Sequence, residues 1–365
     1  DHVFSALSEI LPGRVLDGKY RLERKIGKGG FGAVYRAMHI GLNRAVAIKI
    51  FRPSPVSRKK GDGVVRFRRE GISACRVDHP NAVSVLDFGI SRSGIAYLVM
   101  ELLRGRTLGA TLKVRHVLSL RRCVEILTPV CSVLMAASAA NVLHRDIKPE
   151  NIFLHRTEAG EVVKVVDFGI AKLMGDDDEP DAAAAVSSDA TGMLSEPMHT
   201  TGLIGTPVYM APERLLSEPY DVRADIYSVG VLLYRMISGR IPFTSKKGGF
   251  RLMTEICEKG PRPLREVCPS CPPDVAALVM SAMAQSPDDR PTADELAERF
   301  QRAVEQLPAE LADYVPEGIQ PSGEALRELH TMRTQSGDEG SYAITLPSFS
   351  LDEAEAGELA QSGGD

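Results

Sequence analysis

The sequence contains no tryptophan, and aromatic residues make up only 5% of its 365 residues. Apolar residues still account for 44% of the chain, the usual share for a globular protein with a full hydrophobic core. The six cysteines are too few for a disulfide scaffold at this length, and the first residues do not resemble a secretory signal. We therefore expect a reducing, cytoplasmic setting.

Long apolar runs are also lacking. The longest, VCSVLMAASAANVL at residues 130–143, is shorter than the roughly 20 residues that a helix needs to cross a bilayer. We expect no transmembrane segment within this chain. Because the chain begins with Asp1 rather than methionine, the sequence leaves open whether a membrane anchor lies outside it.

Cys268 and Cys271, in CPSC, have the spacing of half a zinc site or of a redox pair. No second pair of cysteines with matching spacing occurs in the sequence. We interpret the two residues as part of a proline-rich loop.

The net charge of −4 is unevenly distributed, because residues 304–365 carry 13 acidic and only 2 basic residues. A basic body therefore precedes an acidic tail. Residues 175–199 are also acidic and rich in alanine and serine, and neither segment has the apolar periodicity of a folded element. We divide the chain into an N-terminal extension, a small lobe, a large lobe that contains the 175–199 insert, and a tail that is disordered or a linker: residues 1–17, 18–103, 104–303 and 304–365.

The small lobe is predicted to be rich in β-structure and the large lobe to be helical. Five runs of branched and aromatic residues in the first third of the chain are typical of strands, at residues 20–26, 33–40, 44–51, 82–90 and 96–102. One helical segment, residues 64–77, interrupts them. Four longer helical segments follow, at residues 120–143, 224–239, 274–285 and 292–307. The join between the lobes is expected near residues 101–105.

Residues 26–34 read IGKGGFGAV, in which glycines 27, 29 and 32 allow backbone amides to approach phosphate oxygens closely. In isolation this pattern also fits a flexible hairpin turn. Here a strand precedes the glycines and another strand follows them, whereas a dinucleotide-binding fold would place a helix after them. The pattern favours a lid over a nucleotide.

Residues 144–151 read HRDIKPEN, with one aliphatic residue among charged and polar ones. A buried helical segment precedes this octet, and two short β-type runs, IFLHR and EVVKVVDFGI, follow it. The octet is therefore predicted to lie in a loop held between a helix and a hairpin, the kind of loop on which catalytic groups are found.

Together these motifs resemble those of eukaryotic-like serine/threonine protein kinases of the kind found in bacteria. The resemblance covers residues 20–300, and the motifs occur in register. They are IGKGGFGAV (26–34), VAIK (46–49), RFRREGI (66–72), HRDIKPEN (144–151), DFG (167–169), GTPVYMAPE (205–213), DIYSVG (225–230) and DDRPT (288–292). The resemblance implies an α+β, bilobal kinase fold with one regulatory helix in the small lobe.

The implied activity is transfer of the terminal phosphate of ATP to serine or threonine hydroxyls of proteins. Asp146 would accept the proton of the attacking hydroxyl, and Lys148 would neutralise the transferring group. Asn151 and Asp167 would hold Mg²⁺, with Mn²⁺ as an alternative, because hard cations prefer oxygen ligands. Lys148, together with Thr206, matches the serine/threonine pattern rather than the tyrosine pattern.

The resemblance also implies a nucleotide site. Lys49 would hold the α and β phosphates and be steadied by Glu70. A lysine within the apolar run AVAIKI supports this role, because a charge buried there is costly unless it has a partner. Val34, Ala47 and Phe153 would sandwich the adenine, Met100 would be the gatekeeper, and the backbones of Glu101 and Leu103 would bind the adenine edge. The glycine-rich loop would supply the remaining contacts: Ile26, Gly27, Lys28, Gly29, Gly30, Phe31, Gly32 and Ala33.

Three further roles are implied for structural residues. His144 and Phe168 are interpreted as packing residues, Glu213 and Arg290 as a buried ion pair, and Asp225 as the anchor of the catalytic loop. Two departures from the family pattern stand out. Tyr227 replaces a common tryptophan, and 47 residues separate Asp167 and Glu213 inclusively, which makes the activation segment unusually long.

Arg145 directly precedes Asp146, as in kinases whose activation segment is ordered by phosphorylation. We expect autophosphorylation in trans, within a transient homodimer, at Thr200 or Thr201. Ser187, Ser188 and Thr191 are weaker candidates. The acidic tail either folds back on the basic run RKKGDGVVRFRRE or is a solvated linker, and the linker interpretation is favoured.

The main alternative from another class is a pseudokinase, in which the same fold acts as a scaffold or nucleotide sensor. Lys49, Asp146, Asn151 and Asp167 are all present, which argues against it. A dinucleotide-dependent oxidoreductase is disfavoured by the strand after the glycines, and nothing beyond the modest basic charge supports nucleic-acid binding. The expected partners are protein substrates.

Overall fold

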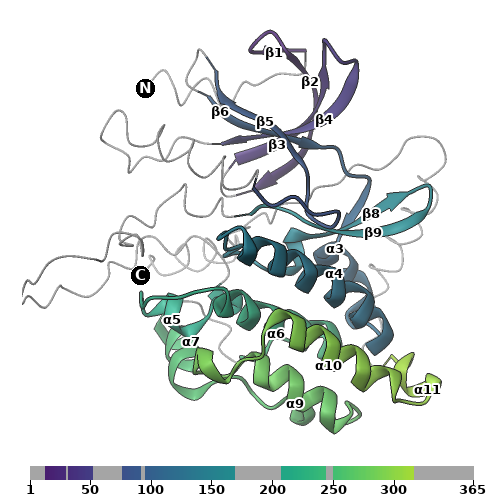
Figure 1. The fold of residues 1–365 in the computed structure, drawn as a ribbon, viewed down its shortest axis with the longest axis vertical. Helices are drawn as coiled ribbons and strands as arrows, with labels where there is room; N and C mark the ends of the chain where they lie inside the picture. Colours follow the sequence, from purple (N-terminus) through teal and green to yellow (C-terminus); the bar gives the residue numbers. More distant parts are fainter. Residues whose placement is uncertain are drawn as a thin grey trace, which may run out of the picture.

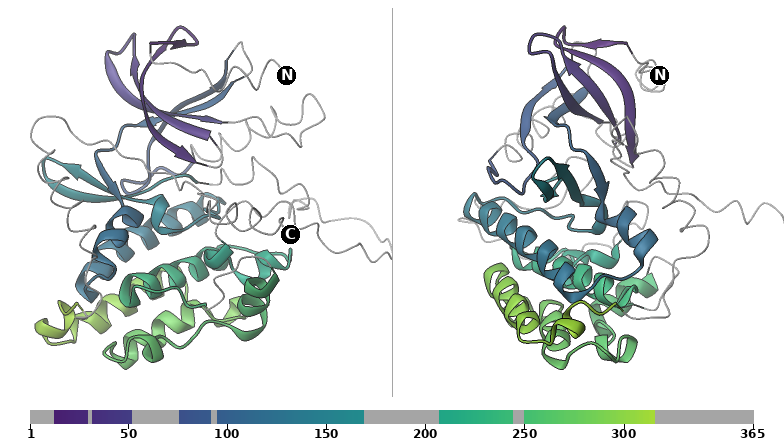
Figure 2. Two further views of the ribbon diagram at one scale, coloured as in Figure 1. Left: turned by 180° about the vertical axis from the view of Figure 1, so that it is seen from behind. Right: turned by 90° about the vertical axis from the view of Figure 1, so that its right-hand side faces the viewer.

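The structure is a computed structural model of the chain and describes residues 13–29, 32–51, 76–91, 95–168, 207–243 and 250–315. A curled, six-stranded sheet forms a small lobe, and a larger lobe made mainly of helices lies below it in Figure 1. The same division is seen from behind and from the side (Figure 2). Residues 101–105 connect the last strand of the first sheet with the first strand of a second sheet.

The six strands of the small lobe are antiparallel to their neighbours, in the order β1-β2-β3-β4-β6-β5. Their bounds are β1 Val15–Leu16, β2 Tyr20–Gly29, β3 Gly32–His39, β4 Arg44–Phe51, β5 Val85–Ile90 and β6 Ala96–Glu101.

Strand β4 is buried on both faces, as its almost wholly apolar sequence RAVAIKIF predicts. Val46, Ile48 and Ile50 join one apolar cluster, and Ala47 joins the cluster on the opposite face. Because side chains alternate along a strand, Lys49 shares the face of Ala47. The sheet thereby presents this lysine beneath the small lobe.

The large lobe combines a second sheet, of order β7-β8-β9, with helices around one large apolar core. The strands are β7 Gly105–Thr107, β8 Ile152–Thr157 and β9 Gly160–Val165. The α-helices are α3 Leu108–Arg115, α4 Leu120–Ala139, α5 Pro212–Leu215, α6 Arg223–Ser238, α7 Phe250–Thr254, α8 Leu264–Val267, α9 Pro273–Ala282, α10 Ala293–Glu305 and α11 Ala309–Ala312. Short 3-10 turns are η1 Pro149–Asn151, η3 Pro207–Tyr209 and η5 Pro287–Asp289, and η4 Glu255–Lys259 is a π-helical turn.

The sequence explains where the longer helices begin and end. Ser119 caps α4 by accepting a hydrogen bond from the backbone of Arg122 at 3.3 Å. Thr292 and Glu295 form a reciprocal capping box at the start of α10. Helix α6 ends at Gly239, whose φ of 69° places it in the left-handed region that glycine tolerates best.

The five predicted strands and four long helices are confirmed, with ends that shift by a few residues. The two β-type runs after the charged octet form the antiparallel hairpin β8–β9. The prediction did not include α3, β7 or the short helical turns. The predicted helix at 64–77 lies almost wholly outside the described residues.

Helix α4 begins ten residues before the apolar run at 130–143 that was judged too short to cross a bilayer. Its 20 residues and hydropathy of 1.4 meet the length and composition of a membrane span, and it is the one such helix among the residues described. Core helices also meet these criteria, and α4 packs against α6, α10 and β9. Its apolar character is therefore weak support for a membrane segment.

Cys268 and Cys271 are buried residues of the loop between α8 and α9, consistent with the loop interpretation. Both are free thiols, and the backbone N–H of Cys271 donates to the carbonyl of Cys268 at 3.0 Å. Within the described ranges, no group of three or more His, Cys, Asp and Glu side chains is arranged to hold a metal ion.

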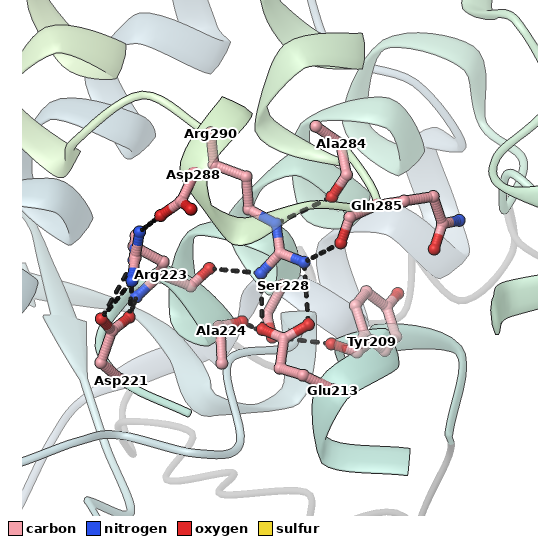
Figure 3. A network of polar contacts seen from close by, with 10 residues as sticks. All are labelled: Tyr209, Glu213, Asp221, Arg223, Ala224, Ser228, Ala284, Gln285, Asp288 and Arg290. Atoms are coloured by element: carbon pink, nitrogen blue, oxygen red, sulfur yellow. Dashed lines mark hydrogen bonds and ion pairs between the residues drawn. The ribbon is translucent and has the colours of Figure 1, made fainter. Parts of the chain in front are cut away.

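Glu213 and Arg290 form the predicted buried ion pair of the large lobe (Figure 3). Two guanidinium nitrogens of Arg290 donate to the two carboxylate oxygens of Glu213 at 2.6 and 2.8 Å. The remaining N–H groups donate to the carbonyls of Ala284, Gln285 and Arg223 at 2.9 to 3.1 Å. The guanidinium also lies 5.1 Å from the ring centroid of Tyr227, the residue that stands where the resembled kinases commonly have tryptophan.

Replacing Arg290 with methionine is expected to lower the free energy of unfolding by about 3 to 5 kcal/mol, because it leaves the Glu213 carboxylate buried and unpaired. Arg223→Met removes a neighbouring arginine whose partners, Asp221 and Asp288, are exposed. That control should cost less than about 1 kcal/mol. Urea unfolding measures both changes, and equal losses would contradict the assignment.

Candidate functional site

The charged octet lies between the two lobes and is held by a carboxylate from helix α6. Asp225, only 3% exposed, accepts hydrogen bonds from the backbone N–H groups of His144 and Arg145, both at 2.8 Å. Arg145 adopts a φ of 67°, an unusual conformation for a residue with a side chain. The two hydrogen bonds to Asp225 stabilise this turn and thereby fix the backbone position of Asp146.

His144 is fully buried and has no ring nitrogen left for proton transfer. Its Nδ1 accepts the backbone N–H of Asp146 at 3.2 Å, so the ring hydrogen must lie on Nε2. Nε2 then donates to the carbonyl of Val166 at 3.0 Å. The ring also packs against Phe168 at a centroid distance of 4.7 Å, which supports the packing interpretation of both residues.

Asp146, Lys148 and Asn151 converge within the octet. Lys148 Nζ lies 2.9 and 2.7 Å from the two carboxylate oxygens of Asp146. Asn151 Nδ2 donates to the backbone carbonyl and to Oδ2 of Asp146, each at 2.8 Å. The amide oxygen of Asn151 therefore points away from Asp146, and the carboxylate, whose side chain is 30% exposed, opens toward solvent.

Lys49 of β4 forms an ion pair with Asp167, with Nζ 2.8 Å from Oδ2. The two side chains are only 3% and 13% exposed, so each charge needs an opposite charge nearby. Val166, which precedes Asp167, donates its N–H to the Asn151 carbonyl at 2.9 Å. This bond joins the ion pair to the octet. The predicted partner Glu70 lies outside the described residues.

Six residues of the predicted nucleotide site belong to one buried apolar cluster between the sheet and β8. They are Ile26, Val34, Ala47, Met100, Leu103 and Phe153. The side chain of Ala33 instead packs with the cluster on the other face of the sheet, as the alternation from Val34 requires.

The described part of the glycine-rich loop is the end of the β2–β3 hairpin, in which Gly27, Lys28 and Gly29 pair with Val34, Ala33 and Gly32. Gly32 has a φ of 152°, and a Cβ there would overlap the carbonyl oxygen of Ile50. Only glycine fits this position without moving β4. Gly30 and Phe31, at the tip, lie outside the described residues.

The sequence did not reveal a second buried lysine, Lys164 of β9. Its Nζ lies 2.7 Å from Oε1 of Glu101 and 3.3 Å from the carbonyl of Ala82. The same Glu101 oxygen accepts the N–H of Ser84 at 2.9 Å, and the N–H of Glu101 donates to the Ser84 carbonyl at 3.0 Å. An ion pair therefore connects the segment between the lobes to the large-lobe hairpin.

Neighbouring contacts hold the 79–84 segment against the large lobe. The Asn81 side chain donates to the Val163 carbonyl at 2.8 Å, and backbone bonds join residues 81 and 83 to Val165. His79 contacts Ser132 of α4 at 2.9 Å, and partial burial lowers the pKa of its imidazole. The lobes are thus coupled through this segment as well as through residues 101–105.

Arg145 and Arg214 both lie close to the ring of Tyr220. Their guanidinium carbons are 5.9 and 5.3 Å from the Tyr220 ring centroid, and Arg214 donates to the Arg145 carbonyl at 2.5 Å. Nε of Arg145 is buried without a hydrogen-bond partner among the described residues. Thr200, Thr201 and Thr206 lie outside those residues.

The chain matches the family model described as protein kinase domain over residues 20–300. Serine/threonine-protein kinase pkn3 of Myxococcus xanthus is 33% identical over 339 residues, which are 92% of this chain and 59% of that protein. Probable serine/threonine-protein kinase PknB of Corynebacterium glutamicum is 33% identical over 291 residues, 78% of this chain and 42% of that protein. This chain therefore spans less than two thirds of the length of these relatives.

Among solved structures, the Mycobacterium tuberculosis PknI kinase domain is similar, with a TM-score of 0.59 and 23% sequence identity. The alignment covers 80% of this chain and 99% of that domain. This likeness shows the bilobal kinase fold, and the sequence comparisons show the family. The chain belongs to the protein kinase domain family, among the bacterial serine/threonine protein kinases.

Proposed function

We propose that this chain transfers the terminal phosphoryl group of ATP to serine and threonine hydroxyls of proteins. The observation that carries the proposal is the convergence of Asp146, Lys148 and Asn151 beside the Lys49–Asp167 pair. This arrangement brings a base, two cations and oxygen ligands to one place between the lobes. Phosphoryl transfer depends mainly on such positioning and charge neutralisation.

Asp146 acts as the proton acceptor. Its carboxylate is partly exposed, so a substrate hydroxyl can reach it, while Asn151 and Lys148 fix its orientation. The Lys148 ammonium, within 2.9 Å of both carboxylate oxygens, puts positive charge where the transferring group develops negative charge. Because both ring nitrogens of His144 are used in hydrogen bonds, Asp146 is the base of this loop.

Membership in the family implies ATP and a divalent metal ion, and we propose Mg²⁺. The donors fit this ion, because the Asp167 carboxylate and the outward-facing amide oxygen of Asn151 are hard oxygen ligands. Asp167 and Asn151 would hold it, and the bound ion would neutralise phosphate charge. Lys49 would then pair with phosphate oxygens in place of part of its contact with Asp167.

The buried apolar cluster forms the adenine pocket. All five of its predicted adenine contacts belong to this cluster, so Val34 and Ala47 would cover one face of the adenine and Phe153 of β8 the other, with Met100 and Leu103 at its edge. The backbone of residues 101–103 supplies the polar contacts that orient the base. Lys164 is a positioning residue for this segment, because it holds the Glu101 side chain at 2.7 Å.

We further propose that phosphorylation of Thr200 or Thr201 in trans activates the chain. Arg145 and Arg214 offer two guanidinium groups near the same tyrosine ring, and Arg145 retains a buried N–H without a partner among the described residues. A phosphate dianion would satisfy these donors and order the activation segment.

Asp146→Asn is expected to lower phosphate transfer from ATP with Mg²⁺ by roughly 10² to 10⁴-fold, because the base is lost. ATP binding, measured by calorimetry, should stay close to wild type. Labelled phosphate is followed on the chain and on a generic basic protein, with Asp221→Asn as the exposed control. If the wild type binds ATP but transfers no label after phosphorylation by an active kinase, the pseudokinase alternative is favoured instead.

Lys164→Met is expected to raise the KM for ATP by roughly threefold to tenfold while kcat changes little, because Glu101 loses a charge-assisted hydrogen bond. Lys164→Arg should recover most of the affinity, and Lys113→Met on the surface of α3 is the control. A fall in kcat at constant KM would contradict a positioning role at the adenine edge.

Replacing Thr200 and Thr201 together with valine is expected to leave activity roughly tenfold or more below the wild type, because Arg145 loses its phosphate partner. Mass spectrometry of the active wild-type enzyme should find phosphate on one of the two threonines. A fully active enzyme in which both threonines are unmodified would rule the activation scheme out.

A further inference from the structure

Three arginines gather on one side of the large lobe, and we call them the arginine patch: Arg106, Arg115 and Arg156. Arg106 lies in β7, Arg115 ends α3 and Arg156 lies in β8. The β7–β8 pairing sets Arg106 opposite Leu154, so that Arg156 is its diagonal neighbour on the same face. Arg115 and Arg156 are exposed and Arg106 is partly buried.

The arginine patch is short of negative charge. Among the residues described, none of its members forms an ion pair. The nearby carboxylate of Glu161 is already bound by Arg122 of α4. Burial is the main cause that lowers the pKa of the Arg106 guanidinium, and the charges of Arg115 and Arg156 lower it further, against the opposing effect of Glu161. The three arginines therefore lie close enough to repel one another. An acidic ligand here would relieve this repulsion.

The described chain ends beside this surface. Asp313, just after α11, accepts a hydrogen bond from Nε of Arg121 at 2.7 Å. Arg121 precedes Arg122, which reaches Glu161 at the edge of the arginine patch. Figure 1 shows α11 close to one end of α4. Arg121 and Arg122 lie in the first turn of α4.

The residues that follow Val315 are strongly acidic. Residues 316–365 contain ten acidic residues and only two basic ones, Arg327 and Arg333. Because the segment is covalently attached next to the arginine patch, its effective concentration there is far higher than that of a separate acidic molecule. Opposite charges thus meet without a diffusional encounter.

We propose that the acidic segment 316–365 docks on the arginine patch of its own chain. The occupant is this segment rather than an external acidic protein, because charge complementarity and attachment point to the same place. The contact is made of exposed charge pairs, each of them weak, so it depends on ionic strength. Docking covers the surface beside β7, directly after residues 101–105.

Limited proteolysis of the full chain tests this contact without depending on kinase activity. Trypsin can cut residues 316–365 only at Arg327 and Arg333. Replacing all three patch arginines with alanine should increase cleavage at these two sites by roughly fivefold at low salt, the size expected for a few weak exposed pairs. In about 0.5 M salt, where the Debye length is short, wild type and variant should be cut equally fast.

The matched control replaces Arg14, Arg21 and Arg44 with alanine, which removes the same charge from exposed positions of the small-lobe sheet. It should leave cleavage at Arg327 and Arg333 unchanged. Because partly buried Arg106 contributes to the fold, a second variant, Arg115→Ala with Arg156→Ala, changes exposed side chains only. This double variant should show a smaller increase in cleavage at Arg327 and Arg333.

A reciprocal variant neutralises four tail carboxylates, with Asp338→Asn, Glu339→Gln, Asp352→Asn and Glu353→Gln. It should reproduce the faster cleavage, and combining it with the patch variant should add little further, because both remove one contact. Cleavage that is the same in every variant at low salt would overturn the proposal. So would patch variants that change only the KM for an acidic protein substrate, since that result assigns the arginine patch to an external partner.

Discussion

The buried carboxylate of Asp225 fixes the catalytic loop, and the positions of the reacting groups follow from that contact. Its two oxygens accept the N–H groups of His144 and Arg145, which keeps Arg145 in its left-handed conformation. His144 then bonds both to the backbone of Asp146 and to Val166, just before Asp167. Asp225 therefore fixes the position of Asp146. Through the imidazole of His144 it also fixes the segment that carries Asp167. Such placement matters because small errors in position cost much of the rate.

Three buried or nearly buried charge pairs complete the frame, and each has a different task. Glu213 and Arg290 join α5 to the segment before α10, where all five N–H groups of the arginine are used. Lys164 and Glu101 tie the connection between the lobes to β9, and Lys49 and Asp167 place opposite charges where nucleotide and metal would bind. Their partners lie 2.6 to 2.8 Å apart, whereas the arginine patch on the surface lacks such partners among the described residues. In these three pairs the buried charges are compensated within a lobe or across the lobes.

Much of this arrangement could be predicted from the sequence because it depends on residues that are close together in the chain. The run of branched and apolar residues in RAVAIKIF predicted β4, and the kinase resemblance carried by HRDIKPEN implied that Asp146, Lys148 and Asn151 act together. Lys164 was missed although it also interrupts an apolar run, since only the folded chain shows that β9 lies beside Glu101. Helix α3 was missed because it is short. Ala33 was predicted as a contact of the glycine-rich loop, and its side chain packs on the other face of the sheet. Glu70, the phosphorylation sites, the 175–199 insert, the homodimer and the cytoplasmic location stay predictions, because the described residues do not test them.

The most direct test of the central role of Asp225 is the steady-state kinetics of Asp225→Asn. The variant keeps the volume of the side chain but replaces one acceptor oxygen with an amide nitrogen, so one backbone N–H of the loop loses its partner. We predict that kcat falls by roughly 10- to 100-fold while the KM for ATP changes less than about twofold, because the base is displaced and the adenine pocket is not. Asp221→Asn, at an exposed position just before α6, is the matched control and should leave both constants unchanged. An Asp225→Asn enzyme with wild-type kcat would contradict the account.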